Sequence, residues 1–343
     1  MQNTRDIRAI PTWAWKLGML SCAVIWGASF VIIKDTLDVV PACWLMAVRF
    51  LIATVLMAAI FWRRLRDNFD WSHLLAGGVL GVLYGAGFAV QNLGLTYTTP
   101  GRSAFLTATY CVLVPFLNWA VVRRRPGASS LAAAVLSIAG IALISLGDDM
   151  RPSLGPGEWL TLLSAVFFAL QIVFVGRFTS SHDMTTISVA QLGFMSLTCA
   201  LFSLALGEQA PVVSGLDASF WLSLAYLAIL SSCVTTLIQN VGQAFVPPAQ
   251  SALLLSLESV FAVIASVIFY HELLTPQLVL GFSLVFLGVL ASELGPTLLA
   301  RRAAAQRAQE GVRLAAVLRG RGAGSTRQPQ PRCQRRPGRS GSR

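Results

Sequence analysis

Ten stretches of the chain are apolar over about 20 residues each, and short polar segments separate them. An α-helix needs about 20 apolar residues to cross the hydrocarbon core of a bilayer. The first stretch reaches Ile33, which is too long for a cleaved signal peptide, so it counts as a span. The predicted spans are 14–33, 42–62, 73–93, 102–122, 129–146, 158–176, 185–206, 219–240, 249–269 and 276–294. Because several connections are very short, neighbouring spans should be antiparallel in a compact helical bundle.

A polar motif recurs 148 positions further along the chain, together with glycines that keep the same spacing. The matching positions are Gln91, Asn92, Gly94 and Gly140 in the first copy and Gln239, Asn240, Gly242 and Gly288 in the second. Each copy carries five predicted spans, and an odd number makes the second copy enter the membrane from the opposite side. Such inverted repeats are typical of secondary transporters.

The pattern therefore predicts an all-α integral membrane protein with ten transmembrane helices in two inverted five-helix repeats. The first repeat should occupy residues 1–147 and the second residues 148–296. Residues 297–343 should form a basic, partly disordered cytoplasmic tail, because they are rich in Gly, Pro, Ser and Arg and cannot bury a core.

Composition supports a membrane protein, with 55% hydrophobic and 12% charged residues, against about 25% charged in ordinary soluble domains. The net charge of +11 comes from the tail, which holds twelve Arg and one Glu from Thr297 onward. The other 14 basic and 14 acidic residues cancel, so the charge is no sign of nucleic-acid binding. We interpret the tail as a solvated topogenic segment, and attraction to anionic inner-leaflet lipid is the alternative.

Basic residues also predict the orientation of the bundle. They gather before span 1, after span 2, after span 4 and in the tail, and the predicted topology puts all four segments on one side. Loops rich in Lys and Arg face the cytoplasm. We therefore expect a multi-pass protein of the inner or plasma membrane of the cell, with both termini in the cytoplasm.

Arg49 and Glu258 fall inside predicted spans 2 and 9. Ionisable residues within a bilayer must be paired or face water, which makes them candidates for function. Arg49 is a candidate ligand for an anionic substrate group, unless it extends to the interface or pairs with an acidic neighbour. Glu258 is a candidate proton carrier, and a permanently protonated glutamate hydrogen-bonded to a facing helix is the alternative. The repeat aligns Glu258 with Tyr110, so the two halves place different chemistry at equivalent depth.

Amides and aromatic rings inside the spans supply further candidates for a substrate cavity. These candidates are Trp26, Gln91, Asn92, Tyr110, Gln171, Gln191, Gln239 and Asn240. The Gln-Asn pairs lie at the ends of spans 3 and 8, where they either line a vestibule or hydrogen-bond between helices. Gln191 aligns with Arg49 at an offset of 142. Trp26 lies in the middle of span 1, facing either the cavity or a packed helix.

Small residues and one proline predict how the helices pack and bend. Gly77, Gly81 and Gly85 recur every four residues along span 3 and give that helix a smooth face for close approach by another helix. Pro115 removes a backbone hydrogen bond inside span 4 and should kink it, which predicts a gating bend there.

The sequence carries no signal of an enzyme or of an ATP-driven pump. Its three histidines lack metal-ligand spacing, and neither a nucleophile elbow nor a Walker loop is present. The six cysteines occur singly and are expected to be reduced packing residues. We expect no cofactor, no metal and no nucleic-acid partner. The expected partners are a small-molecule substrate and membrane lipid, with a proton or counter-solute as the coupling species.

Several motifs resemble the EamA-type branch of the drug/metabolite transporter superfamily over about residues 15–295. They are Trp26-Gly27-Ala28-Ser29-Phe30, Ala47-x-Arg49-Phe50, Gly94-Leu95-x-Tyr97-Thr98-Thr99 followed by Ala104-Phe105-Leu106 and Pro115, Leu257-Glu258, and Glu272-Leu273-Leu274-Thr275-x-Gln277 before Gly281. The resemblance implies the ten-helix inverted fold, cytoplasmic termini and a cavity between the halves. It also implies export or exchange of small metabolites, often amino acids or related compounds. The chain departs from the family at Ser259, where a proline that would kink span 9 is common, and at Ser29, where asparagine is common.

These observations predict a secondary transporter, an exporter or exchanger of small amino-acid-like metabolites that works by alternating access around a cavity at the bilayer midplane. We expect spans 1, 3, 4, 6, 8 and 9 to form the cavity walls. A lipid or lipid-carrier flippase or scramblase on the same scaffold is the alternative.

Overall fold

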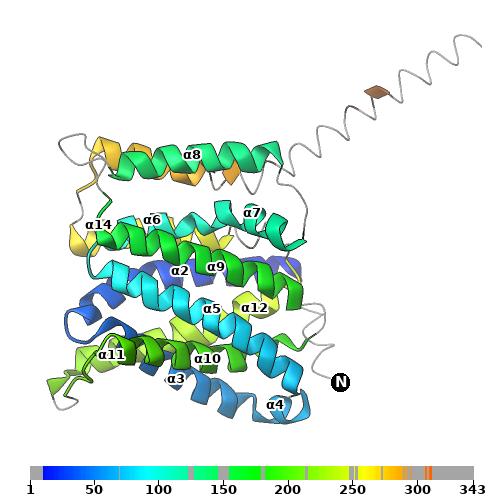
Figure 1. Ribbon diagram of the computed structural model, residues 1–343, viewed down its shortest axis with the longest axis vertical. Coiled ribbons are helices and arrows are strands. Elements are labelled where there is room, and N and C mark those ends of the chain that lie inside the picture. Colours follow the sequence, from blue (N-terminus) through cyan, green and yellow to red (C-terminus); the bar gives the residue numbers. More distant parts are fainter. Residues whose placement is uncertain are drawn as a thin grey trace, which may run out of the picture. The chain divides into compact units, whose positions relative to one another are not determined.

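A computed structural model describes most of the helical body. The described residues are 11–68, 70–122, 127–145, 154–178, 182–212, 215–246, 251, 254–271, 273–288, 290–291, 295, 306 and 309–310. All of the regular secondary structure in these ranges is helical (Figure 1). The expected disorder of the tail concerns residues that lie almost wholly outside the described part of the chain.

Seven segments are long and apolar enough to cross a membrane. They are α2 (Thr12–Leu37), α3 (Ala42–Ile60), α5 (Trp71–Leu95), α6 with α7 (Pro100–Ala108 and Tyr110–Val122), α9 (Pro156–Phe178), α10 (Met184–Ala205), and α11, η2 and α12 in succession (Ala218–Ala228, Ile229–Val234 and Thr235–Gly242). A short helix, α4 (Trp62–Asn68), follows α3. The chain is therefore an all-helical, multi-pass membrane protein.

Three further apolar helices are shorter. They are Leu131–Leu143 within α8 (Ala128–Ser145), Leu254–Tyr270, which includes α14 (Glu258–Tyr270), and Pro276–Gly288. Each helix of both sets overlaps one predicted span. Because the described parts of these three helices are shorter than the roughly 20 residues of a typical crossing, the predicted total of ten crossings and its two-repeat arrangement stay a prediction.

Aspartates mark where several helices begin. Asp70, Asp183 and Asp217 precede α5, α10 and α11, and each side chain accepts a hydrogen bond from the backbone N–H three residues later. Aspartate at this position satisfies one of the free N–H groups of the first turn and complements the positive end of the helix. The predicted start of span 3 at residue 73 is therefore moved to Trp71.

Two helices are interrupted at positions that correspond under the 148-residue repeat. Thr109 separates α6 from α7, and Leu257 immediately precedes α14. Hydroxyl groups bond back to carbonyls three residues earlier at both places, from Thr109 to Leu106 and from Ser259 to Ser256. The absence of proline at position 259 therefore does not leave this helix continuous. In the other half, the interruption lies at Thr109, whereas Pro115 lies within α7.

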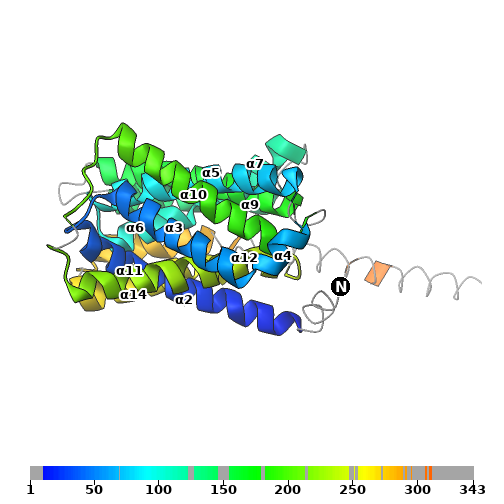
Figure 2. The ribbon, with the colours of Figure 1, turned by 90° about the horizontal axis from the view of Figure 1, so that it is seen from below.

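Helices from the two halves of the sequence pack against each other throughout the body. α2 packs on α14 and α12, α9 packs on α5, α6 and α7, and α3 packs on α10. In Figure 1, α3 and α10 lie together at one end of the body, and α8 lies at the other beside the helix Pro276–Gly288. Figure 2 views the same bundle from the end where α3 and α10 lie, with α2, α11 and α14 along the lower edge of the picture.

The glycines of span 3 make the close approach that their spacing predicts. A Cβ atom added at Gly77, Gly81 or Gly85 would lie 2.4–2.9 Å from atoms of α10. Distances this short leave no room for any side chain, so α5 and α10 contact through their backbones at these three positions. Gly87, by contrast, faces the Phe168 ring of α9.

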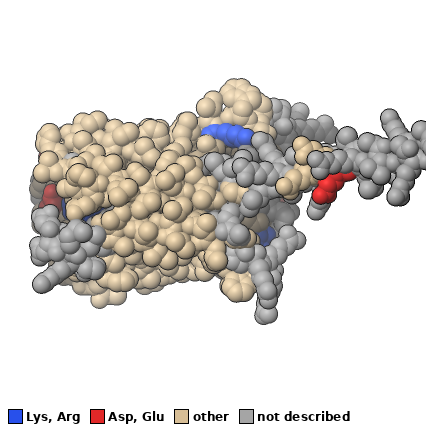
Figure 3. All heavy atoms as spheres, turned by 90° about the horizontal axis from the view of Figure 1, so that it is seen from above, with Lys and Arg blue, Asp and Glu red and all other residues tan. Residues whose placement is uncertain are grey.

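The outer surface of the body is suited to lipid. Large apolar side chains are exposed on its helices, with Val55, Leu197 and Leu201 each more than half exposed. The face of the body in Figure 3 carries almost no charged residue across its middle. An apolar band of this kind on a helical bundle is expected where hydrocarbon, rather than water, surrounds the protein.

Candidate functional site

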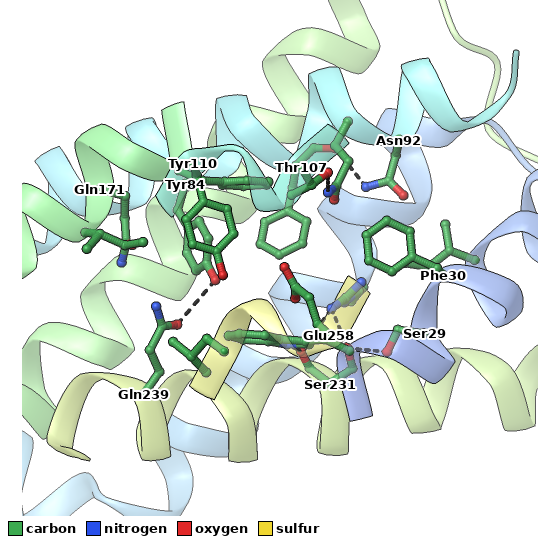
Figure 4. Close-up of a pocket in the computed structure, with 18 residues that line it drawn as sticks. Ser29, Phe30, Tyr84, Asn92, Thr107, Tyr110, Gln171, Ser231, Gln239 and Glu258 are labelled. Atoms are coloured by element: carbon green, nitrogen blue, oxygen red, sulfur yellow. Dashed lines mark hydrogen bonds between the residues drawn. The ribbon is translucent and has the colours of Figure 1, made fainter. Parts of the chain in front are cut away.

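A cavity lies inside the bundle and encloses about 600 Å³ of space that protein atoms do not fill, part of it open to the outside. Side chains from α2, α3, α5, α6, α7, α9, η2, α12 and α14 line it, together with Leu255 (Figure 4). Aromatic rings form much of its wall. They belong to Trp26, Phe30, Tyr84, Phe88, Tyr110 and Phe168. An apolar and aromatic chamber with a few polar groups is typical of a small-molecule site.

Eight of the predicted candidates lie on this cavity. They are Trp26, Arg49, Gln91, Asn92, Tyr110, Gln171, Gln239 and Glu258. The helices predicted to form the walls, those of spans 1, 3, 4, 6, 8 and 9, all contribute. Span 2 also contributes, through Arg49.

Gln191 and Asn240 lie outside the cavity lining. The Asn240 side chain donates hydrogen bonds of 2.9 Å to Gln191 Oε1 and to Ser188 Oγ. These bonds join α12 to α10, so both residues act here as contacts between helices rather than as vestibule groups. The alignment of Gln191 with Arg49 thus does not give them the same environment.

Arg49 is 1% exposed, and it neither extends to an interface nor pairs with an acidic residue within the described ranges. Its Nε donates to Ser232 Oγ at 2.7 Å, and its Nη2 donates to both the carbonyl and the hydroxyl of Ser231 at 3.0 Å. The guanidinium lies 5.1 Å from the ring centre of Phe50 and 5.5 Å from that of Phe88. Neutral oxygens and aromatic faces therefore hold a buried cation beside the cavity.

A π-helical turn supplies the oxygens that hold Arg49. Residues 229–234 of span 8 form η2, where backbone bonds connect residues five apart. The Ser231 carbonyl accepts bonds from Trp26 Nε1 and Thr235 Oγ1 in addition to Arg49. The equivalent stretch of span 3, residues 81–86, is regular α-helix. The two halves therefore differ in backbone as well as in side chains at this level.

Glu258 is the first residue of α14 and follows the turn at Leu257. It is 7% exposed, and its side chain lines the cavity. Figure 4 shows its carboxyl group between the end of the cavity formed by Gln171 and Gln239 and the end formed by Ser29 and Asn92. Among the described residues, no side chain or backbone group hydrogen-bonds this carboxyl group. The alternative interpretation, a protonated glutamate hydrogen-bonded to a facing helix, would need such a partner, and none of the described residues provides it.

The amides on the cavity differ in how fully they are paired. Gln91 Nε2 donates to Thr107 Oγ1 at 2.8 Å, and Gln239 Oε1 accepts from Tyr84 at 3.3 Å. Gln171 is fully buried, and neither of its amide atoms has a hydrogen-bond partner among the described residues. An unpaired buried amide costs about 1–3 kcal/mol for each polar group. The end of the cavity near Gln171 is therefore the place where a new polar contact would stabilise most.

Sequence reasoning missed several cavity residues, and the second repeat contains the signal for some of them. An offset of 142 aligns Trp26 with Phe168 and Phe30 with Ile172, and all four line the cavity. Applying the offset to Trp26 would have identified Phe168. Ser231 carried no such signal, because its role depends on the π-helical turn.

The sequence profile of the EamA-like transporter family matches this chain at residues 13–146 and again at residues 155–293. The chain belongs to this family, a branch of the drug/metabolite transporter superfamily. Its family indicates a membrane transporter rather than an enzyme.

Similar proteins include an uncharacterized transporter of Archaeoglobus fulgidus, 27% identical over 274 residues, which cover 80% of this chain and 84% of that protein. The uncharacterized transporter YcxC of Bacillus subtilis is 23% identical over 278 residues, which cover 78% and 89% of the two chains. A solved crystal structure matches 84% of this chain and 98% of its own, with a TM-score of 0.62 and 18% identity. At this identity the structure supports the fold alone.

Proposed function

We propose that the protein is a secondary transporter that exports or exchanges small amino-acid-like metabolites by alternating access. The observation that carries the proposal is the cavity, which side chains from both halves of the sequence line together. A solute held there would contact both halves, so rocking of one half against the other would expose it first on one side and then on the other.

The two inverted five-helix repeats that this mechanism needs have three supports. The family profile matches twice, once in each half of the chain. The contact of α2 with α14 has a counterpart in the contact of α9 with α7, as expected for spans 1 and 9 and spans 6 and 4. The interruptions at Thr109 and Leu257 are 148 residues apart. We assign residues 1–147 and 148–296 to the repeats on this basis.

The chemistry of the cavity favours a solute with both anionic and polar groups. Arg49 offers a cation with no acidic partner among the described residues, while the Glu258 carboxyl group is available for a proton or for a cationic group of the solute. An anion that arrives and a proton that binds Glu258 change the charge of the cavity in opposite directions. Glu258 would couple proton movement to transport in this way.

We place the protein in the inner or plasma membrane of the cell with both termini in the cytoplasm. The support is the distribution of basic residues, which gather in the segments after spans 2 and 4 and in the tail. A tag at residue 1 and a tag at residue 343 should then both be protected from a membrane-impermeant label in intact cells. Labelling of either tag would overturn the topology.

Counterflow in liposomes tests the transport function. Purified protein is reconstituted into vesicles loaded with one unlabelled amino acid at a time, and uptake of the labelled compound is measured against empty liposomes. Saturable uptake that depends on the internal compound is expected for at least one member of the panel. Movement of labelled phospholipid without amino-acid counterflow would instead support the flippase alternative.

The role of Glu258 has its own test. Glu258→Gln removes the titratable proton with little change in shape, so proton-driven uptake should be lost while counterflow remains measurable. The matched control adds Gln191→Glu to Glu258→Gln. Because Gln191 lies outside the cavity lining, a carboxyl group there should not restore the coupling that Glu258→Gln removes. Equal proton-driven uptake by wild type and Glu258→Gln would remove Glu258 from the mechanism.

A further inference from the structure

The five N–H groups of Arg49 are not equally available to a solute. A carboxylate that binds a guanidinium through two parallel hydrogen bonds uses either Nε with Nη2 or Nη1 with Nη2. In this structure Nε donates to Ser232 Oγ, and Nη2 donates to both the carbonyl and the hydroxyl of Ser231. Each two-point face therefore includes at least one nitrogen that already donates to a serine.

Nη1 is the nitrogen that remains. Its acceptor here is the thioether sulfur of Met46 at 3.7 Å, which is a weak acceptor. Arg49 lines the cavity, and among the contacts of the described residues Nη1 is the guanidinium nitrogen with the weakest acceptor, so it is the one most readily exchanged for a solute oxygen. One such contact is weaker and less directional than a two-point contact.

The arrangement is built by the backbone and not by flexible surface groups. Ser231 and Ser232 both lie on the π-helical turn η2 and are 2% and 1% exposed. Ser232 Oγ is held by its own bond to the Leu227 carbonyl at 2.8 Å, and Ser231 Oγ lies 2.7 Å from Ser29 Oγ. The serine oxygens are thus fixed where the oxygens of a bound carboxylate would otherwise lie.

We propose that Ser231 and Ser232 are specificity-determining residues that occupy the two-point faces of Arg49 and limit a solute anion to a single contact through Nη1. The proposal deepens the proposed function, because it concerns the same cavity and a carboxylate-bearing solute. A transporter must release the solute that it binds. Neutral serine oxygens that already accept hydrogen bonds from the guanidinium lower its affinity for an anion and so favour release.

Removal of one hydroxyl gives a prediction of definite sign. Ser231→Ala removes one of the two acceptors of Nη2, so Nη2 can join Nη1 in a two-point contact and a carboxylate should bind about tenfold more tightly, as one added charge-assisted hydrogen bond implies. Benzoate and benzamide serve as probes because they have the same shape and differ in charge. Their dissociation constants are obtained from the rise in thermal unfolding midpoint of the full chain in detergent.

Benzoate binding should tighten in Ser231→Ala, while benzamide binding stays as in the wild type. Ser137→Ala removes a buried serine hydroxyl from α8, outside the cavity, and should change neither constant. Arg49→Lys lacks the two-point faces, so Ser231→Ala added to it should bring no gain.

Unchanged or weaker benzoate binding in Ser231→Ala would overturn the proposal, and so would an equal gain for benzamide. If Ser231→Ala unfolds on purification, Ser231→Gly removes the same hydroxyl and decides by the same criterion. These outcomes are separate from the fate of the proposed function, because failure of amino-acid counterflow by the wild type leaves the benzoate comparison intact.

Discussion

Replacement of Gly81 by alanine should force α5 and α10 apart. The added Cβ would lie 2.5 Å from both the Gln191 carbonyl oxygen and the Phe194 Cβ. Ordinary contact for such atoms begins at 3.4 Å, so the helices would have to separate by about 0.9 Å at this point. Neither neighbour is the end of a flexible side chain, so rotation of a side chain cannot relieve the overlap.

The expected cost follows from two opposing effects. Overpacking of a close contact costs about 1–3 kcal/mol, and further loss follows because Gly77 and Gly85 lie on the same contact. Alanine in place of glycine favours the helix itself by about 1 kcal/mol. Gly78→Ala is the matched control, because its Cβ would meet the Phe194 ring at 3.4 Å or more. Both variants gain the same helix propensity, so they should differ by the overpacking cost alone, about 1–3 kcal/mol, with Gly78→Ala the more stable.

The measurement is unfolding of each purified variant in mixed micelles with increasing dodecyl sulfate, followed by circular dichroism. Wild type, Gly78→Ala and Gly81→Ala are compared at equal detergent composition. If Gly81→Ala unfolds at the same point as Gly78→Ala, the close contact of α5 with α10 is not what stabilises this part of the bundle. Loss of stability in both variants would point to a role of glycine within α5 alone.

Three further outcomes are expected. Arg49→Lys should lower the affinity for carboxylated solutes in counterflow, because lysine lacks the planar guanidinium that can contact the serines and the cavity together. Unchanged affinity would mean that Arg49 has a structural role only. Arg64→Ala should lower stability by about 1–3 kcal/mol in the same dodecyl sulfate assay, because the partly buried Asp183, the cap of α10, loses its charged donor. Burial raises the pKa of Asp183, but hydrogen bonds from Arg64 and Thr186 outweigh it and lower the pKa overall. A lowered pKa contributes stability that is complete above the unfolded value of about 3.9 and is lost as pH falls through the folded pKa, so wild type and Arg64→Ala should converge in acid but differ at pH 7.

Much of the fold follows from the hydrophobic pattern alone. A helix in the membrane must form its backbone hydrogen bonds within itself, so each span is visible in the sequence as a long apolar stretch. The helix ends were less accurate. Span 3 begins at Trp71 because Asp70 caps it, and the capping aspartate is a local signal that a hydropathy window averages away. The interruption at Leu257 was not predictable, because no proline marks it. The Ser259 hydroxyl bonds back to the Ser256 carbonyl there instead.

The candidate site was predictable where polarity inside a span is costly, as it is for Arg49, Gln171 and Glu258. The site was not predictable where a hydrogen bond from a neighbouring helix satisfies the buried polar group. Asn240 and Gln191 are as polar as the cavity amides, yet they bond to each other between α12 and α10. A sequence cannot show whether a buried amide faces a helix or a chamber. That choice depends on rotations of neighbouring helices, which spacing alone does not fix.

The two halves of the sequence interrupt helices at positions 148 residues apart, yet they differ in the chemistry that they bring to the cavity. Thr109 and Leu257 interrupt equivalent helices, yet the residues that follow are Tyr110, which carries a phenol, and Glu258, which carries a carboxyl group. Symmetric interruptions suit a motion that must work alike in both directions. A solute is not symmetric, so a chamber that binds one orientation of it needs unlike groups at equivalent depths. The π-helical turn that holds Arg49 occurs in only one of the two equivalent stretches, residues 229–234 and not 81–86, which follows the same logic.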